Sequence, residues 1–323
     1  MKHRFTLVAS FVVAACGNAG SDLGVEPPPL KTVNVATFLD RDGSATPSEA
    51  DTAYAGVRLI IRPAAGGLPV QTITTNAQGQ AQFDDIPVGS YSVSVDPASL
   101  GDSLLVAAVS PTTLRLMFDQ GILDQTIRLA YPELSIQNAR QDVPGRRVMI
   151  RGLVLAGVQS YRDTTSYVQD ATGRVRLTRV SLRGGLTGNN PGDSITVIGS
   201  ISSRAGQPTL DQAIITLLGF RPSPIPFALT TAVAATANGG VLDAGLVQIT
   251  AATITEATLV APDLRVVVDD GSGPLTMILD SQGGFNQAAF IPGRVLNARG
   301  ILVPDGTGRW QLKPRGGGDV TVF

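Results

Sequence analysis

The segment YVQDATGRVRL, residues 167–177, reads as a strand, a tight polar turn and a second strand. A similar segment, VVDDGSGPLTM, follows at residues 267–277. In each, an aspartate can hydrogen-bond to its own backbone and a glycine accepts a positive φ, so both predict a tight turn between antiparallel strands. The chain is therefore predicted to contain the same β-hairpin twice.

The sequence on either side of each hairpin repeats as well. The apolar stretch 146–155 precedes the first hairpin and corresponds to 245–254 before the second. Residues 190–210 follow the first hairpin and correspond to 291–312 after the second. The shared order of features indicates a tandem duplication, and each copy is long enough to bury its own core. Each is predicted to form about five antiparallel strands.

These motifs resemble the OB-like domains of bacterial secreted proteins, some of which are attached to extracellular nucleases. The shared marks are the Asp–Gly hairpin turns, Pro191-Gly192-Asp193 before the fourth strand, and the closing Leu312-Lys313-Pro314. The second copy has Arg294 in place of Asp193. The resemblance spans residues 133–323 and implies a five-stranded, partly open barrel. No nuclease catalytic motif accompanies it.

The beginning of the chain has the pattern of an export signal. A basic segment at residues 2–4 precedes an apolar run at residues 5–15. That run is shorter than the roughly 20 apolar residues that a permanent membrane-spanning helix needs. It is therefore predicted to be a signal peptide.

The end of this signal, Val13-Ala14-Ala15-Cys16-Gly17, resembles the lipobox of bacterial lipoproteins. The resemblance implies that the Cys16 thiol carries a lipid and that acyl chains attach the protein to a membrane. The alternative is an ordinary signal peptide with a cysteine there by chance. Gly17 is not the aspartate that retains many lipoproteins at the inner membrane, which favours the outer membrane, on its periplasmic or cell-surface side.

Residues 17–30, GNAGSDLGVEPPPL, are polar and contain three consecutive prolines, which predicts a tether. The predicted organisation is a signal peptide at 1–16, the tether at 17–30, and three β domains at 31–130, 131–222 and 223–323.

The scarcity of histidine and cysteine restricts the chemistry of this chain. His3 is its only histidine and would be removed with the signal peptide, and Cys16 is its only cysteine. A histidine base, a cysteine nucleophile or a His/Cys metal site is then excluded within the exported chain. Carboxylate-based hydrolysis, as in glycosidases, remains the least favoured alternative. The protein is expected not to be an enzyme.

The first β domain resembles the prealbumin-like sandwiches of bacterial surface proteins, such as the B-type domains of serine-aspartate repeat and collagen adhesins. The matching residues are Gly56-Val57, Gly79, Phe83 and Pro87-x-Gly89-x-Tyr91. The resemblance covers about 70 residues and implies a stalk or spacer. The predicted fold is therefore all-β, with a prealbumin-like sandwich followed by two tandem OB-like barrels.

Some members of that family bind calcium through an acidic loop after the first strand. Oxygen ligands that suit a hard cation are present here in Asp40, Asp42, Ser44, Glu49 and Asp51. A structural calcium ion is one interpretation, and a solvated acidic turn is the other. No other cofactor is expected.

The two copies of the repeat differ in charge. Residues 131–222 contain eleven arginines, no lysine and six acids, a net charge of +5, whereas residues 223–323 have a net charge of −2. The candidate ligand-binding residues are basic or aromatic: Arg147, Arg151, Tyr161, Tyr167, Arg174, Arg176 and Arg179. Such residues on an OB barrel favour a polyanion such as single-stranded nucleic acid. The alternative is an arginine-rich solvated face.

The sequence thus predicts a lipid-anchored cell-envelope protein with a non-catalytic binding or spacer role. Its partners would be the membrane, through the anchor, and other envelope proteins. The alternative function is binding of a polyanion or oligosaccharide on behalf of a separate secreted enzyme.

Overall fold

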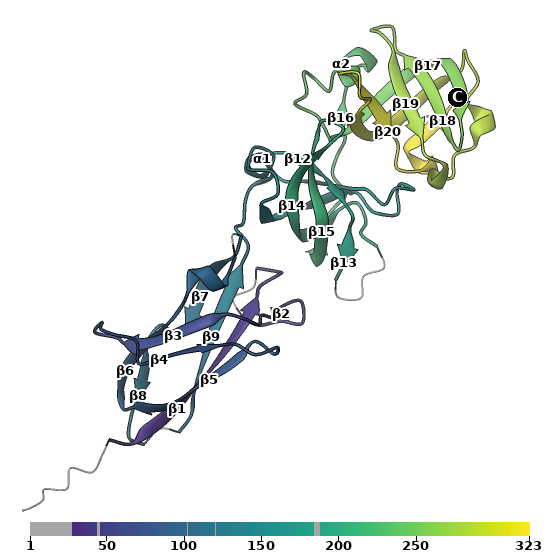
Figure 1. Ribbon diagram of the computed structural model, residues 1–323. Helices are drawn as coiled ribbons and strands as arrows, with labels where there is room; N and C mark the ends of the chain where they lie inside the picture. The colour runs from purple at the N-terminus through teal and green to yellow at the C-terminus, as the bar shows by residue number, and fades with distance from the viewer. Residues whose placement is uncertain (1–27, 44–45, 102, 120, 184–187) are drawn as a thin grey trace, which may run out of the picture.

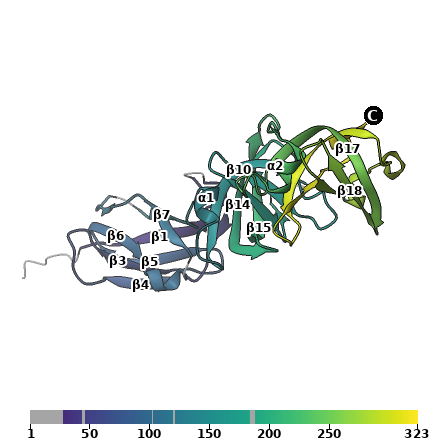
Figure 2. The same ribbon diagram turned by 90° about the horizontal axis from the view of Figure 1, so that it is seen from above.

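The computed structural model describes residues 28–323, apart from 44–45, 102, 120 and 184–187. The lipobox and most of the tether lie outside these residues. The described chain is all-β, as predicted, and forms a sandwich and two barrels that follow one another along one line (Figures 1 and 2). None of the helices in this part of the chain has the length and apolar character to cross a membrane.

The first unit is a sandwich of two sheets. One sheet contains β1 (Leu30–Leu39), β2 (Thr52–Ala53), β5 (Gln80–Pro87), β7 (Leu105–Ser110) and β9 (Leu123–Ala130). The other contains β3 (Arg58–Pro63), β4 (Gln71–Thr74), β6 (Gly89–Val95) and β8 (Leu114–Leu116), and a short 3₁₀ turn, η1 (Pro97–Ser99), follows β6. Alternate residues of both sheets point inward, so Val33, Leu59, Phe83, Val93 and Ile127 pack into one apolar core.

The second unit is a barrel preceded by a short helix, α1 (Ile136–Ala139). Its strands are β10 (Arg147–Ala156), β11 (Ser166–Gln169), β12 (Arg174–Thr178), β13 (Ser181–Leu182), β14 (Asp193–Arg204) and β15 (Gln207–Phe220). They run in the order β12-β11-β10-β14-β15, and parallel pairing of β12 with β15 closes the barrel.

The third unit repeats this arrangement after α2 (Thr231–Ala235). Its elements are β16 (Phe227–Ala228), β17 (Leu246–Val260), β18 (Asp263–Asp269), β19 (Leu275–Leu279), η2 (Ser281–Gly283), η3 (Gln287–Ala289), β20 (Val295–Pro304), β21 (Trp310–Lys313), η4 (Gly317–Asp319) and β22 (Val320–Val322). The order β17-β18-β19-β21-β20 closes where β17 pairs with β20, and β19 pairs in parallel with β21. Leu312 faces Met277 there, as Leu210 faces Leu177 in the first barrel.

The aspartates of the two quoted hairpins hold the short helices against the barrels. Asp170 accepts the backbone N–H of Ile136 at the start of α1, at 2.8 Å, and Asp270 accepts that of Thr231 at the start of α2, at 3.0 Å. Burial raises the pKa of the Asp270 carboxyl, but hydrogen bonds from Ser272 and Thr231 outweigh it and lower the pKa to about 2. These aspartates therefore have structural partners in both copies.

The sandwich and the first barrel meet at the loop after β1. The Thr196 hydroxyl on β14 donates to the backbone carbonyl of Arg41 at 2.8 Å, and Thr196 is 1% exposed. Gly43 has a φ of +74°, and a side chain there would overlap the guanidinium of Arg151 on β10. The acidic loop therefore packs directly against the barrel wall.

The two barrels share a buried interface. Leu155, Ala156, Tyr161 and Tyr167 of the first barrel form one apolar cluster with Ala244, Leu246, Ile301 and Val303 of the second. The Arg315 guanidinium crosses the interface and donates to the Leu155 carbonyl at 2.8 Å. The barrels therefore pack as a pair with a common core between them.

Candidate functional site

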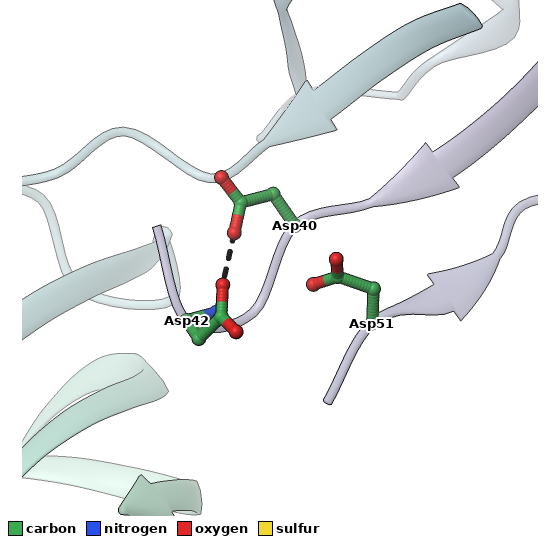
Figure 3. A group of neighbouring side chains, drawn as sticks. All are labelled: Asp40, Asp42 and Asp51. Atoms are coloured by element: carbon green, nitrogen blue, oxygen red, sulfur yellow. Dashed lines mark hydrogen bonds between the residues drawn. The ribbon is translucent and has the colours of Figure 1, made fainter. Parts of the chain in front are cut away.

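The acidic loop brings three of its predicted ligands together. Asp40 follows β1 and Asp51 precedes β2, so pairing of these strands closes the loop with Asp42 between them. Asp40, Asp42 and Asp51 each offer a carboxylate oxygen, and these oxygens lie within 4.8 Å of one another (Figure 3). Glu49 is exposed and outside this group, and Ser44 lies outside the described residues.

The three carboxylates differ in their surroundings. Asp40 is 1% exposed, and its Oδ2 accepts from Nη1 of Arg128 at 2.8 Å. Burial raises the pKa of Asp40, hydrogen bonds from Gly43 and Arg128 oppose this, and the charge of Asp51 adds to the increase. Asp51 accepts the backbone N–H groups of Arg41 and Ser48, each at 2.9 Å.

This arrangement fits a hard cation in the chemistry of its donors. Calcium takes carboxylate oxygens in flexible numbers, and three carboxylates close together repel one another unless a cation is near. The Arg128 guanidinium offsets one of the three charges. Asp40, Asp42 and Asp51 are the residues that would hold calcium, whose charge would stabilise the loop against the barrel.

The two predicted ligand-binding tyrosines lie between the barrels. Tyr161 is 1% exposed and Tyr167 is 2% exposed, and their rings meet edge to face with centroids 6.1 Å apart. The Tyr161 hydroxyl donates to the Lys313 carbonyl at 3.0 Å, and the Lys313 ammonium lies 4.2 Å from the Tyr161 ring centroid. The expectation that these rings stack on a ligand is therefore corrected, because packing against the second barrel covers both of them.

The arginines of β12 also take part in structural contacts. The Arg174 guanidinium lies 4.8 Å from the ring centroid of Phe227, and burial lowers its pKa. Arg176 pairs with Asp163 at 3.5 Å, with its side chain 13% exposed. Arg174 and Arg176 share a strand face as predicted, but that face is occupied by contacts within the barrel pair.

The remaining predicted arginines divide into paired and unpaired groups. Arg179 forms a bidentate ion pair with Asp211, and Arg151 forms an ion pair with Glu133 at 2.8 Å. Arg147 lies over the ring of Tyr131, 5.5 Å from its centroid, and forms no ion pair with a carboxylate of the described chain. The predicted arginines are therefore distributed over several structural environments and do not line one groove.

A polar groove of about 400 Å³ on the sandwich was not predicted. It runs over the outer face of β5, β1 and β9, where Gln82, Asn34 and Asp124 lie in register. The Asn34 amide donates to Asp124 at 3.1 Å. The alternation of polar residues with core residues on β1 and β5 is the sequence signal for this face.

Comparison with known proteins gives no family assignment. No family model matches the chain. Colossin-A of Dictyostelium discoideum is 33% identical over 67 residues, which is 21% of this chain and 1% of that protein's length.

Solved structures show only distant likeness. A murine DNA-binding protein bound to double-stranded DNA is 10% identical, with a TM-score of 0.29 over 54% of this chain and 95% of that one. The p202 HIN1 domain in complex with a 12-mer duplex is 10% identical, with a TM-score of 0.28 over 56% and 93% of the two chains. Asparaginyl-tRNA synthetase from Pyrococcus horikoshii is 11% identical, with a TM-score of 0.25 over 29% of this chain and 22% of the synthetase. Likeness at this level assigns neither a fold family nor a ligand.

Proposed function

We propose that this chain is a lipid-anchored, non-catalytic protein of the cell envelope that holds its barrels away from an outer membrane. In this proposal the sandwich is prealbumin-like and acts as a spacer, and the two barrels are OB-like and act as binding modules, with other envelope proteins or a separate secreted enzyme as partners. The observation that supports this proposal best is the position of the two ends of β1. Leu30 begins β1 at the end of the sandwich remote from the first barrel, whereas Arg41, just after β1, contacts that barrel (Figure 1). The chain therefore enters the sandwich at the end remote from both barrels, and in this proposal the tether joins the molecule at that end.

The anchor is tested by replacing Cys16 with alanine in a two-membrane bacterium that expresses the full chain. The wild-type chain is expected to incorporate labelled fatty acid and to sediment with outer membranes. The variant is expected to do neither, because it lacks the thiol that takes the lipid. Ser10→Ala, a change of similar size in the apolar run, serves as the matched control. An unlabelled wild-type chain would overturn the anchor.

A structural calcium site is a second proposal, supported by the grouping of Asp40, Asp42 and Asp51. Calcium at saturating concentration is expected to raise the melting temperature of the sandwich by about 5 °C or more, because it binds only the folded loop. In Asp42→Asn this increase should largely disappear, since the side chain keeps its size but loses its charge. Glu49→Gln, in the same loop but outside the cluster, should retain it. The measurement is differential scanning calorimetry with calcium and with a chelator, and an equal response of the two variants would contradict the site.

A further inference from the structure

Arg41 carries a buried charge at the junction between the sandwich and the first barrel. The residue is 9% exposed, and its Nε donates to the Thr52 hydroxyl at 2.8 Å. Its Nη1 is buried and has no hydrogen-bond partner among the described residues. Because an unpartnered buried donor is destabilising, such an atom requires an explanation, and an anionic ligand is one.

Two further arginines lie around the same junction. The Arg41 carbonyl contacts Thr196 on β14, and the next residue, Val197, pairs with Ile215 on β15. The backbone N–H of Arg183 donates to the Ile215 carbonyl at 3.0 Å, which places Arg183 beside this contact. Arg147 pairs with Ser200 farther along β14.

The charges of these arginines act on one another. Burial lowers the pKa of Arg41, and the positive charges of Arg183 and Arg147 lower it further, while Tyr131 and Asp51 act in the opposite sense. Nε of Arg147 is also buried without a partner. Arg41, Arg147 and Arg183 form no ion pair with a carboxylate in the part of the chain that the structure describes, unlike Arg128, Arg151 and Arg179.

We propose that Arg41, Arg147 and Arg183 form an anion site at this junction, which binds the sulfate or phosphate groups of an anionic polysaccharide. A guanidinium presents its N–H donors in a rigid fork that matches such oxyanions, often through two hydrogen bonds at once. Arg183 is exposed and Arg147 is half-buried, so their guanidinium groups are the ones that such a ligand can reach, and Arg41 adds its positive charge from a buried position.

The same surroundings argue against single-stranded nucleic acid as the ligand. Nucleic acid binding of this kind relies on aromatic rings on which bases stack. Tyr131 and Tyr54 lie in this region, but both pack against the sandwich core, and Arg147 lies over the Tyr131 ring. This inference rests on the binding role proposed above, to which it adds a ligand class, and it is independent of the lipid anchor.

The test measures binding of a heparin oligosaccharide by the purified chain, with Arg147→Gln/Arg183→Gln as the test variant. Both arginines are less buried than Arg41, so the folded state should survive their loss, which circular dichroism checks. Affinity is expected to fall by about tenfold or more, as expected for the loss of charge-assisted hydrogen bonds. Arg115→Gln/Arg204→Gln removes the same charge from exposed positions away from the junction and is expected to change affinity by no more than about twofold.

Three results would overturn the assignment. The first is that heparin does not bind the wild-type chain. The second is an equal loss of affinity in the two double variants, because net charge alone would then attract the ligand. The third is tighter binding of single-stranded DNA than of heparin at equal charge. Inorganic sulfate alone should compete weakly with heparin for the wild-type chain and not for the test variant. Membrane anchoring of the Cys16 chain is measured separately, so failure here leaves that proposal standing.

Discussion

Replacement of Asp243 with alanine is expected to lower the free energy of unfolding of the barrel pair by about 3 kcal/mol or more. Asp243 is 4% exposed and lies where the barrels meet. Its carboxylate accepts from Arg140 at 3.2 Å, from the Gln207 amide at 2.8 Å and from the Trp310 indole at 2.9 Å. Alanine would leave all three donors without this acceptor in a site that water reaches poorly, which is costlier than the loss of an exposed pair.

Two variants define the origin of this effect. Asp243→Asn keeps an oxygen for Gln207 and Trp310 and loses the charge that faces Arg140, so its effect should be smaller. Glu256→Ala removes an acid from an exposed pair with Arg265 and should change stability by at most about 1 kcal/mol. Urea unfolding followed by tryptophan fluorescence measures all three, because Trp310 reports on the same site. If Asp243→Ala and Glu256→Ala are equally stable, the buried network contributes nothing.

Local patterns predicted the parts of the structure that depend on nearby residues. The two hairpins were predicted because alternation, aspartate and glycine act within a few residues of one another. The grouping of Asp40, Asp42 and Asp51 was predicted in part for the same reason, since one short loop carries them. The all-β class followed from the many short apolar strands with glycine and proline between them.

The contacts between domains could not be read from the sequence. Alternation shows which side chains of a strand are buried, but it does not show which body covers them. Arg174 and Arg176 share a face of the strands that usually form the binding face of an OB barrel, which predicted a ligand-binding role. In the structure the second barrel covers the neighbouring Tyr167, and Arg174 lies over the Phe227 ring. Arg41 was missed because it lies among acids, although a lone arginine inside an acidic loop was the available signal.

Replacement of Tyr161 with alanine should separate the barrels as well as destabilise them. The ring is almost fully buried in the shared apolar cluster, and truncation of a buried aromatic side chain typically costs about 3–5 kcal/mol. Tyr161→Phe retains the ring and loses the hydrogen bond to Lys313, so it should cost about 1 kcal/mol. Small-angle scattering of the folded variants is expected to show a larger radius of gyration for Tyr161→Ala than for Tyr161→Phe.

The pH dependence of this interface gives an independent measurement of the same packing. Burial raises the pKa of Tyr161, and the neighbouring Tyr167 raises it further. The folded state therefore keeps both phenols neutral at a pH where the unfolded chain loses its protons. The corresponding stability is fully present below pH of about 10 and is lost as the pH rises above it. Tyr161→Phe should reduce this loss of stability at alkaline pH, because the variant lacks one of the two phenols. Two results would contradict this packing: the same dependence of stability on pH in Tyr161→Phe as in the wild type, or the same radius of gyration in Tyr161→Ala. Either would mean that the Tyr161 ring is not held between the barrels.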